Sequence, residues 1–235
     1  FLGPRFLRMT LASLLCMVAW GQVNAQTTCN GQLYESIADG NSDNTAFNTI
    51  KVDTNPPTFA KLGDKTAANY NALGYNVNDG QFYAMKYNTN NLLRINLDGS
   101  TTDLGSVAGL PKDGTAVFTS GAFDANGNYY IKVQDDTSII YLVDIAAKSA
   151  KAITLTTPIA VSDMAFVNGV LYSVGNNGQL YKIAITNTTG VVTAIGKAYA
   201  TAAGQQLGAQ FGATNGLFGM ANDGTRLSYI HVPTG

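Results

Sequence analysis

The sequence predicts an all-β protein, a β-propeller built from four-stranded blades of about 46 residues. Three observations lead to this fold class. The chain repeats itself at that interval, each repeat consists of short segments with the alternation of β-strands, and residue pairs typical of tight hairpins separate the segments.

The repeat is marked by an aromatic residue that recurs along the chain. Tyr34, Tyr83, Tyr130, Tyr172 and Phe218 lie roughly 42 to 49 residues apart, which is within the range of WD40-like and kelch-like blades. About five units are visible; the first is diverged and the last lacks a clear fourth strand. Two explanations for the unfinished ring stay open at this point. Either Cys29 to Leu33 closes it, or the chain is a fragment of a longer protein.

Each unit contains segments of about five residues that are rich in Tyr, Phe, Val, Ile and Thr with a period of two, whereas a helical repeat needs a 3.6-residue period over longer stretches. Pairs that tolerate positive φ separate these segments, at Asp79-Gly80, Asn126-Gly127, Asn168-Gly169, Asn177-Gly178, Asn215-Gly216 and Asp223-Gly224.

The position of each strand within a blade follows from its composition. The first strand of a unit is rich in Gly and Ala, as expected where strands crowd around the propeller axis. The tyrosines of the second strand, among them Tyr83, Tyr130 and Tyr172, are expected to pack between neighbouring sheets.

Residues 1–25 have the three-part layout of a secretory signal peptide. Arg5 and Arg8 provide the positive region, Leu11 to Trp20 the apolar region, and Val23-Asn24-Ala25 a cleavage site before Gln26. The apolar region has about 10 residues, whereas a membrane-spanning helix needs about 20. We therefore expect a secreted or cell-surface protein without a membrane span after cleavage, with residues 26–235 as one propeller-like domain, and truncation at its C-terminus is one of the two alternatives left open above.

Net charge argues against nucleic-acid binding, and the cysteine content excludes an internal disulfide. Without Arg5 and Arg8 the chain has 12 basic and 15 acidic residues, a net charge of −3, which offers no footprint for nucleic acid. Cys29 would be the only cysteine after cleavage, so no disulfide can form within the mature chain.

The common catalytic signatures are missing from the sequence. It has no Gly-x-Ser-x-Gly, Cys-x-x-Cys, His-Glu-x-x-His or phosphate-loop motif, and its only histidine, His231, is expected to be structural or exposed. Glu35 is the only glutamate and the aspartates are assigned to turns, so the sequence identifies no pair of catalytic carboxylates. These observations favour a protein that is not an enzyme, and no catalytic residue or organic cofactor is assigned.

Calcium is the one metal for which the sequence offers candidate ligands. Asp124, Asn126 and Asn128 match the start of a calcium loop, whose ligands are hard oxygen atoms. The glutamate that would complete an EF-hand is missing, and the same residues also suit a hairpin turn between the first and second strands of a blade.

Three segments together resemble a known family: Tyr-Asn-Ala-Leu-Gly-Tyr at 70–75, Asn-Leu-Leu-Arg-Ile-Asn-Leu-Asp-Gly at 91–99 and Gly-Ala-Phe-Asp at 121–124. The sequence resembles an uncharacterised propeller-like domain of exported bacterial proteins. That domain occurs in secreted or surface proteins of Bacteroidetes and other bacteria, some of them adhesin-like. The resemblance covers about residues 31–235 and implies blade architecture, with no catalytic residues to transfer.

The function expected from these observations is a non-catalytic binding or adhesion module whose partner is an extracellular polysaccharide or protein. Two alternatives stay open. One is an extracellular lyase or hydrolase on a propeller scaffold, which a cluster of Asp, Lys and Tyr at the axis would favour. The other is a structural spacer within a larger surface protein.

Overall fold

A computed structural model describes the chain except for residues 1–31, 39–43, 64–67, 136, 200–205 and 215. The proposed signal peptide and Cys29 therefore lie outside the described residues. All of the regular structure that is described is β-strand, and no helix in this part of the chain could cross a membrane.

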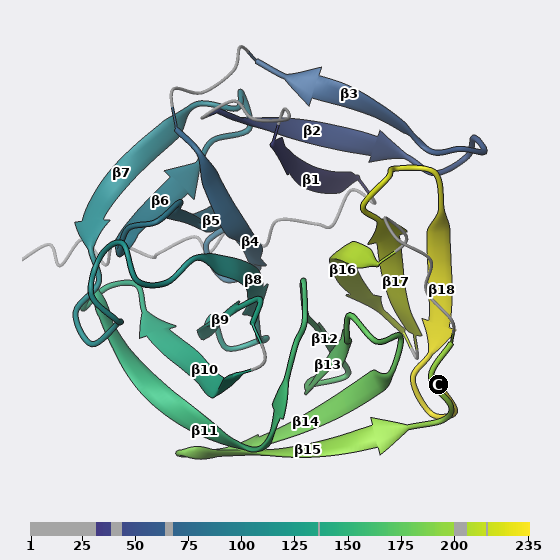
Figure 1. Cartoon of the computed structure of the whole chain (residues 1–235). Coiled ribbons are helices and arrows are strands. Elements are labelled where there is room, and N and C mark those ends of the chain that lie inside the picture. Colours follow the sequence, from purple (N-terminus) through teal and green to yellow (C-terminus); the bar gives the residue numbers. More distant parts are fainter. Residues whose placement is uncertain (1–31, 39–43, 64–67, 136, 200–205, 215) are drawn as a thin grey trace, which may run out of the picture.

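The strands form five antiparallel units around a common axis, which confirms the predicted β-propeller (Figure 1). The first blade contains β1 (Leu33–Ala38), β2 (Thr45–Lys51) and β3 (Thr58–Leu62). The second contains β4 (Tyr70–Asn76), β5 (Gln81–Lys86), β6 (Asn91–Ile95) and β7 (Thr101–Ser106). The third contains β8 (Phe118–Phe123), β9 (Tyr129–Val133), β10 (Thr137–Asp144) and β11 (Ser149–Ile159).

The fourth blade contains β12 (Ala165–Val167), β13 (Val170–Val174), β14 (Leu180–Thr186) and β15 (Thr189–Ile195), and the fifth β16 (Leu207–Ala213), β17 (Gly216–Ala221) and β18 (Leu227–His231). The outer strands β11 and β15 pair in parallel, so the third and fourth blades form one eight-stranded sheet. In Figure 1, β4, β8, β12 and β16 lie at the inside of the ring, and β1 faces the same central space.

Strand register shows how the first blade corresponds to the others. Tyr34 of β1 lies opposite Thr49, the residue before Ile50, just as Tyr83 of β5 lies opposite Arg94, the residue before Ile95. The same relation holds for Tyr130, Tyr172 and Phe218. β1 therefore corresponds to the second strand of the complete blades, and β2 and β3 to the third and fourth.

The hydrophobic core is divided among the contacts between neighbouring blades. Four clusters of buried residues each join two consecutive blades. Tyr83, Tyr130 and Tyr172 are buried in three different clusters, which confirms their predicted place between sheets. Burial of side chains of this size is the main stabilising contribution of one blade to the next.

The Gly- and Ala-rich first strands come very close to one another near the axis, as predicted. A Cβ atom at Gly121 of β8 would lie 2.0 Å from the carbonyl oxygen of Ala72 in β4. A Cβ atom at Gly212 of β16 would lie 1.9 Å from the carbonyl oxygen of Phe166 in β12. Glycine is needed at both positions because a neighbouring backbone occupies the space of a side chain.

Candidate functional site

The three calcium candidates lie together in the turn between β8 and β9. Asp124 Oδ1 accepts hydrogen bonds from the backbone N–H groups of Asn126 and Asn128, both at 2.9 Å. Asp124 Oδ2 accepts one from Asn128 Nδ2 at 2.7 Å. Both carboxylate oxygens thus stabilise the hairpin turn, and calcium binding there stays a prediction. Elsewhere in the described part of the chain, no three His, Cys, Asp or Glu side chains come together as metal ligands.

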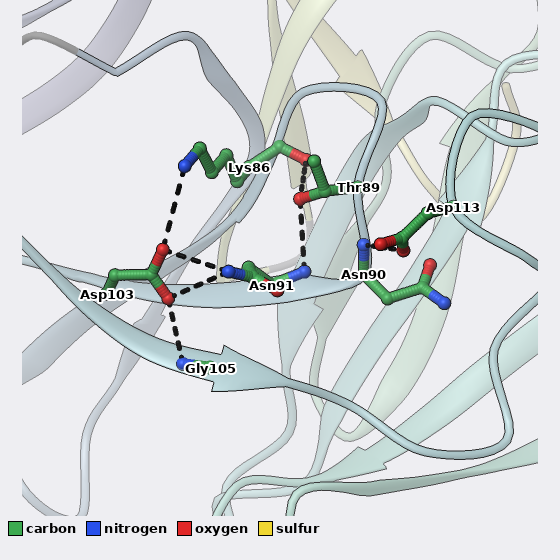
Figure 2. Close-up of polar contacts among 7 residues, drawn as sticks. All are labelled: Lys86, Thr89, Asn90, Asn91, Asp103, Gly105 and Asp113. Carbon is green, nitrogen blue, oxygen red and sulfur yellow. Dashed lines mark hydrogen bonds and ion pairs between the residues drawn. The ribbon is translucent and has the colours of Figure 1, made fainter.

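A polar network on the second blade centres on Asp103, an exposed residue of β7 (Figure 2). Asn91 Nδ2 donates to both of its carboxylate oxygens, Gly105 N–H donates to Oδ1, and Lys86 Nζ lies 3.7 Å from Oδ2. Partial burial opposes ionisation, but these hydrogen bonds and Lys86 hold the pKa of Asp103 below its usual value. Because the partners come from β5, β6 and β7 of one blade, the network stabilises that sheet.

His231 lies at the end of β18 and is exposed, as the sequence predicts. Its Nδ1 lies 3.0 Å from Thr234 Oγ1. It lines neither the cavity between the second and third blades nor the larger cavity at the axis.

One of these cavities, of ≈ 640 Å³, lies between the second and third blades. Asp79 and Tyr83 contribute to its wall, and the Tyr83 hydroxyl donates to Asp79 Oδ2 at 2.8 Å. Burial and this hydrogen bond raise the pKa of Tyr83 to about 12. The polar groups of this pair satisfy each other, so they offer little to a ligand.

A larger cavity of ≈ 870 Å³, the axial cavity, is bordered by residues of all five blades. Its wall is aromatic over a large part, with Tyr34, Phe59, Tyr75, Phe82, Phe123, Phe166 and Phe211. Nine polar side chains also border it, among them Glu35, Asn71, Thr119, Asp163, Gln210 and Asn222, and apolar residues make up most of the remainder. An apolar wall with a few polar groups is typical of ligand sites.

Asp163 connects three blades at this cavity. It lies two residues before β12, and its Oδ2 accepts a hydrogen bond from the backbone N–H of Gln210 in β16 at 2.7 Å. Oδ1 accepts one from Met164 N–H at 2.8 Å, and the backbone N–H of Gly121 in β8 also bonds the carboxylate. Burial raises the pKa of Asp163 to about 8, although these three donors act in the opposite direction. Asp163 is therefore first of all a structural connection between inner strands.

Three carboxyl groups border the axial cavity, those of Asp163, Asp223 and Glu35 of β1. The hydrogen bonding of Glu35 differs from that of Asp163. Its Oε2 is buried and has no hydrogen-bond partner. Burial raises the pKa of Glu35 to about 7, and its charge contributes to raising that of Asp163. A carboxyl group in this state can hold or release a proton near neutral pH, and it can accept hydrogen bonds from a ligand.

Glu35 and Asp163 are two carboxyl groups at one cavity, which the sequence did not identify, and they correct the expectation that the acidic residues lie in turns. Glu35 is in strand β1, and Asp163 lies two residues before strand β12. One signal could have revealed Asp163, because it is an acidic residue in the Gly- and Ala-rich segment next to the axis. No local signal places Glu35 beside it, since closure of the ring alone brings β1 and β12 to the same cavity.

We expect replacement of Glu35 by glutamine to stabilise the protein above neutral pH. Because the folded-state pKa of about 7 exceeds the ordinary 4.5, the folded protein retains a proton that the unfolded chain releases between these values. The free energy of unfolding of the wild type therefore falls as pH rises through this window. Glu35→Gln should match the wild type at pH 4.5 and exceed it by about 2 kcal/mol at pH 8.

Urea denaturation at pH 4.5, 6 and 8 measures this difference. Asp98→Asn is the matched control, because Asp98 is exposed and hydrogen bonds from Ser100 lower its pKa. It should give no gain in stability at pH 8. Equal pH dependence of Glu35→Gln and the wild type would contradict the assignment of a buried, unpartnered carboxyl group.

Comparison with solved structures shows the same fold in other proteins. The chain is similar to glutaminyl cyclase from Myxococcus xanthus, with a TM-score of 0.58 and 12% identity over 86% of this chain and 88% of that one. It is also similar to a protein of unknown function from Bacteroides thetaiotaomicron, with a TM-score of 0.56 and 13% identity over 84% of this chain and 56% of that one. At such identities the likeness concerns the fold alone.

Comparison of sequences identifies the family. No curated protein matches the chain. Residues 34–235 match DUF6923, described as a repeat of unknown function, and this range covers all five blades. The expected resemblance to an uncharacterised repeat domain is confirmed to that extent. The chain belongs to the DUF6923 family of repeats of unknown function.

Proposed function

We propose that this protein is a non-catalytic binding module of an exported protein and that it binds an extracellular polysaccharide or protein at the axial cavity. The observation that carries the proposal is the composition of the cavity wall, where aromatic rings from several blades lie among polar side chains that could bind a ligand. Rigid strands hold these side chains, which favours a preformed binding site. The signal-like segment at residues 1–25 supports export.

The experiment is a binding assay on the chain from Gln26 to Gly235, with glycan arrays and intact cells, in the presence and absence of calcium. Ser36→Trp would place a large ring at the cavity wall, whereas Lys61→Trp adds the same ring on exposed β3 as a control. We expect saturable binding that Ser36→Trp weakens at least about tenfold and Lys61→Trp leaves unchanged. Equal effects of the two variants, or no binding by the folded protein, would contradict the proposal.

One observation favours a second candidate, an extracellular enzyme. Glu35 and Asp163 are two carboxyl groups with raised pKa values at one cavity, and such groups can act as general acid and base. A screen of the same protein for hydrolase and lyase activity on polysaccharides tests this candidate. Activity that disappears in Glu35→Gln while ligand binding persists would favour the enzyme over the binding module.

A further inference from the structure

The inner edge of β1 is the least expected feature of the axial cavity. Within the described residues, β1 is the first strand of its sheet, and β2 is the only strand with which it pairs. All six of its residues, together with Gln32 before it, border the cavity. The backbone edge of a half-buried strand thus faces the space at the axis.

The other blades show what such an edge pairs with. β1 has the register of a second strand, and the second strands β5, β9, β13 and β17 each pair with an inner strand on the side that faces the axis. The N–H and C=O groups along an open edge favour the addition of another extended segment. Its backbone hydrogen bonds would continue those of the β1–β2–β3 sheet.

We infer that β1 is the acceptor for an extended polypeptide segment, which adds to it as the inner strand of the first blade. This inference rests on the proposed function and names its partner as a polypeptide. The segment binds antiparallel to β1 within the axial cavity, and the aromatic side chains of the cavity wall surround it.

Register predicts the side chains of the bound segment. In the other four blades, the inner-strand residues that lie opposite the equivalent aromatic residue are Gly74, Ala122, Ala165 and Phe211. The residue of the bound segment that lies opposite Tyr34 takes the same position. That position holds a small residue in three of these four blades, so a small residue is expected in the partner.

The next two positions follow in the same way. The residue opposite Leu33 corresponds to Tyr75, Phe123, Phe166 and Gly212, and is therefore expected to be aromatic. The residue opposite Glu35 corresponds to Gly121 of β8 and Gln210 of β16. Since residues directly opposite each other project on the same side of a sheet, a lysine there would meet the Glu35 carboxylate, whose Oε2 has no hydrogen-bond partner. The partner sequence is thus a basic residue, a small residue and an aromatic residue, in N-to-C order.

The probe is a fluorescein-labelled synthetic peptide with the sequence of residues 117–125 and the change Gly121→Lys, which gives Lys-Ala-Phe at these three positions. Fluorescence anisotropy with the chain from Gln26 to Gly235 should show saturable binding. A second peptide, which also has Ala122→Trp, should bind at least about tenfold more weakly, because three of the four other blades have a small residue at this position and tryptophan is larger than the Phe211 of the fourth. Glu35→Gln in the protein should weaken the first peptide by about tenfold through loss of the charged partner.

Proline variants in β1 test the backbone edge itself. N–H groups of successive residues alternate between the two edges of a strand, so one of Ser36 and Ile37 donates toward β2 and the other toward the cavity. Of Ser36→Pro and Ile37→Pro, the variant that keeps the wild-type melting temperature should lose peptide binding.

The results separate this inference from the proposed function. Glycan binding at the cavity without peptide binding would overturn the strand acceptor and leave the binding module standing. Peptide binding that is insensitive to Glu35→Gln, to Ala122→Trp and to both proline variants would overturn the acceptor as well. Absence of both kinds of ligand would contradict the two proposals together.

Discussion

Replacement of Gly121 by valine should lower the free energy of unfolding by about 4 kcal/mol, one of the two largest effects expected in this protein. The Cβ atom would lie 2.0 Å from the carbonyl oxygen of Ala72, and a backbone atom cannot rotate away as a side chain can. That carbonyl also accepts a hydrogen bond from the hydroxyl of the fully buried Tyr129. Relief of the clash would therefore separate β8 from β4 and break this bond.

Urea denaturation followed by circular dichroism measures the loss. Gly114→Ala is the matched control, because a Cβ atom at Gly114 meets nothing within 4 Å. Its φ of 79° makes alanine unfavourable, so a cost of about 1 kcal/mol is expected from the backbone alone. A similar cost for both variants would mean that contact between the inner strands is looser than the structure has it.

Most of the fold could be predicted because it depends on patterns that repeat locally. The aromatic residue of each second strand, the Asn-Gly and Asp-Gly turns and the small residues at the axis report blade geometry within a few residues of sequence. The diverged first unit illustrates this point. In the sequence, the spacing of Tyr34 from Tyr83 indicates that residues around Tyr34 form a repeat unit. Strand register in the structure places Tyr34 at the same position of its blade as Tyr83.

The candidate site could not be predicted in the same way, since it depends on which blades meet across the ring. Glu35 and Asp163 belong to the first and fourth blades, yet both border the axial cavity. Sequence periodicity describes each blade by itself and does not show which side chains of non-adjacent blades share a cavity. The calcium candidates depend instead on a local pattern, and the hairpin turn predicted there is present, with Asp124 accepting hydrogen bonds within it. Calcium binding at that turn stays a prediction.

Replacement of Asp163 by alanine should also destabilise the protein by about 4 kcal/mol. The substitution leaves the backbone N–H groups of Gln210, Met164 and Gly121 without their acceptor. An unsatisfied buried donor costs about 1–3 kcal/mol, and water in the cavity can replace part of what is lost. Because Gln210 and Gly121 belong to different blades, the loss should also reduce the cooperativity of unfolding between them.

Two further variants separate this role from a general effect of removing a carboxylate. Asp163→Asn keeps one carbonyl acceptor in place and should cost about half as much as alanine. Asp113→Ala removes an exposed carboxylate that accepts a single backbone bond, from Asn90 at 2.8 Å, and should cost about 1 kcal/mol or less. Thermal and urea unfolding of the three variants should therefore rank Asp163→Ala, Asp163→Asn and Asp113→Ala in order of decreasing loss. If Asp163→Ala proved as mild as Asp113→Ala, Asp163 would not connect the blades, and its carboxyl group would be left for ligand binding or catalysis beside Glu35.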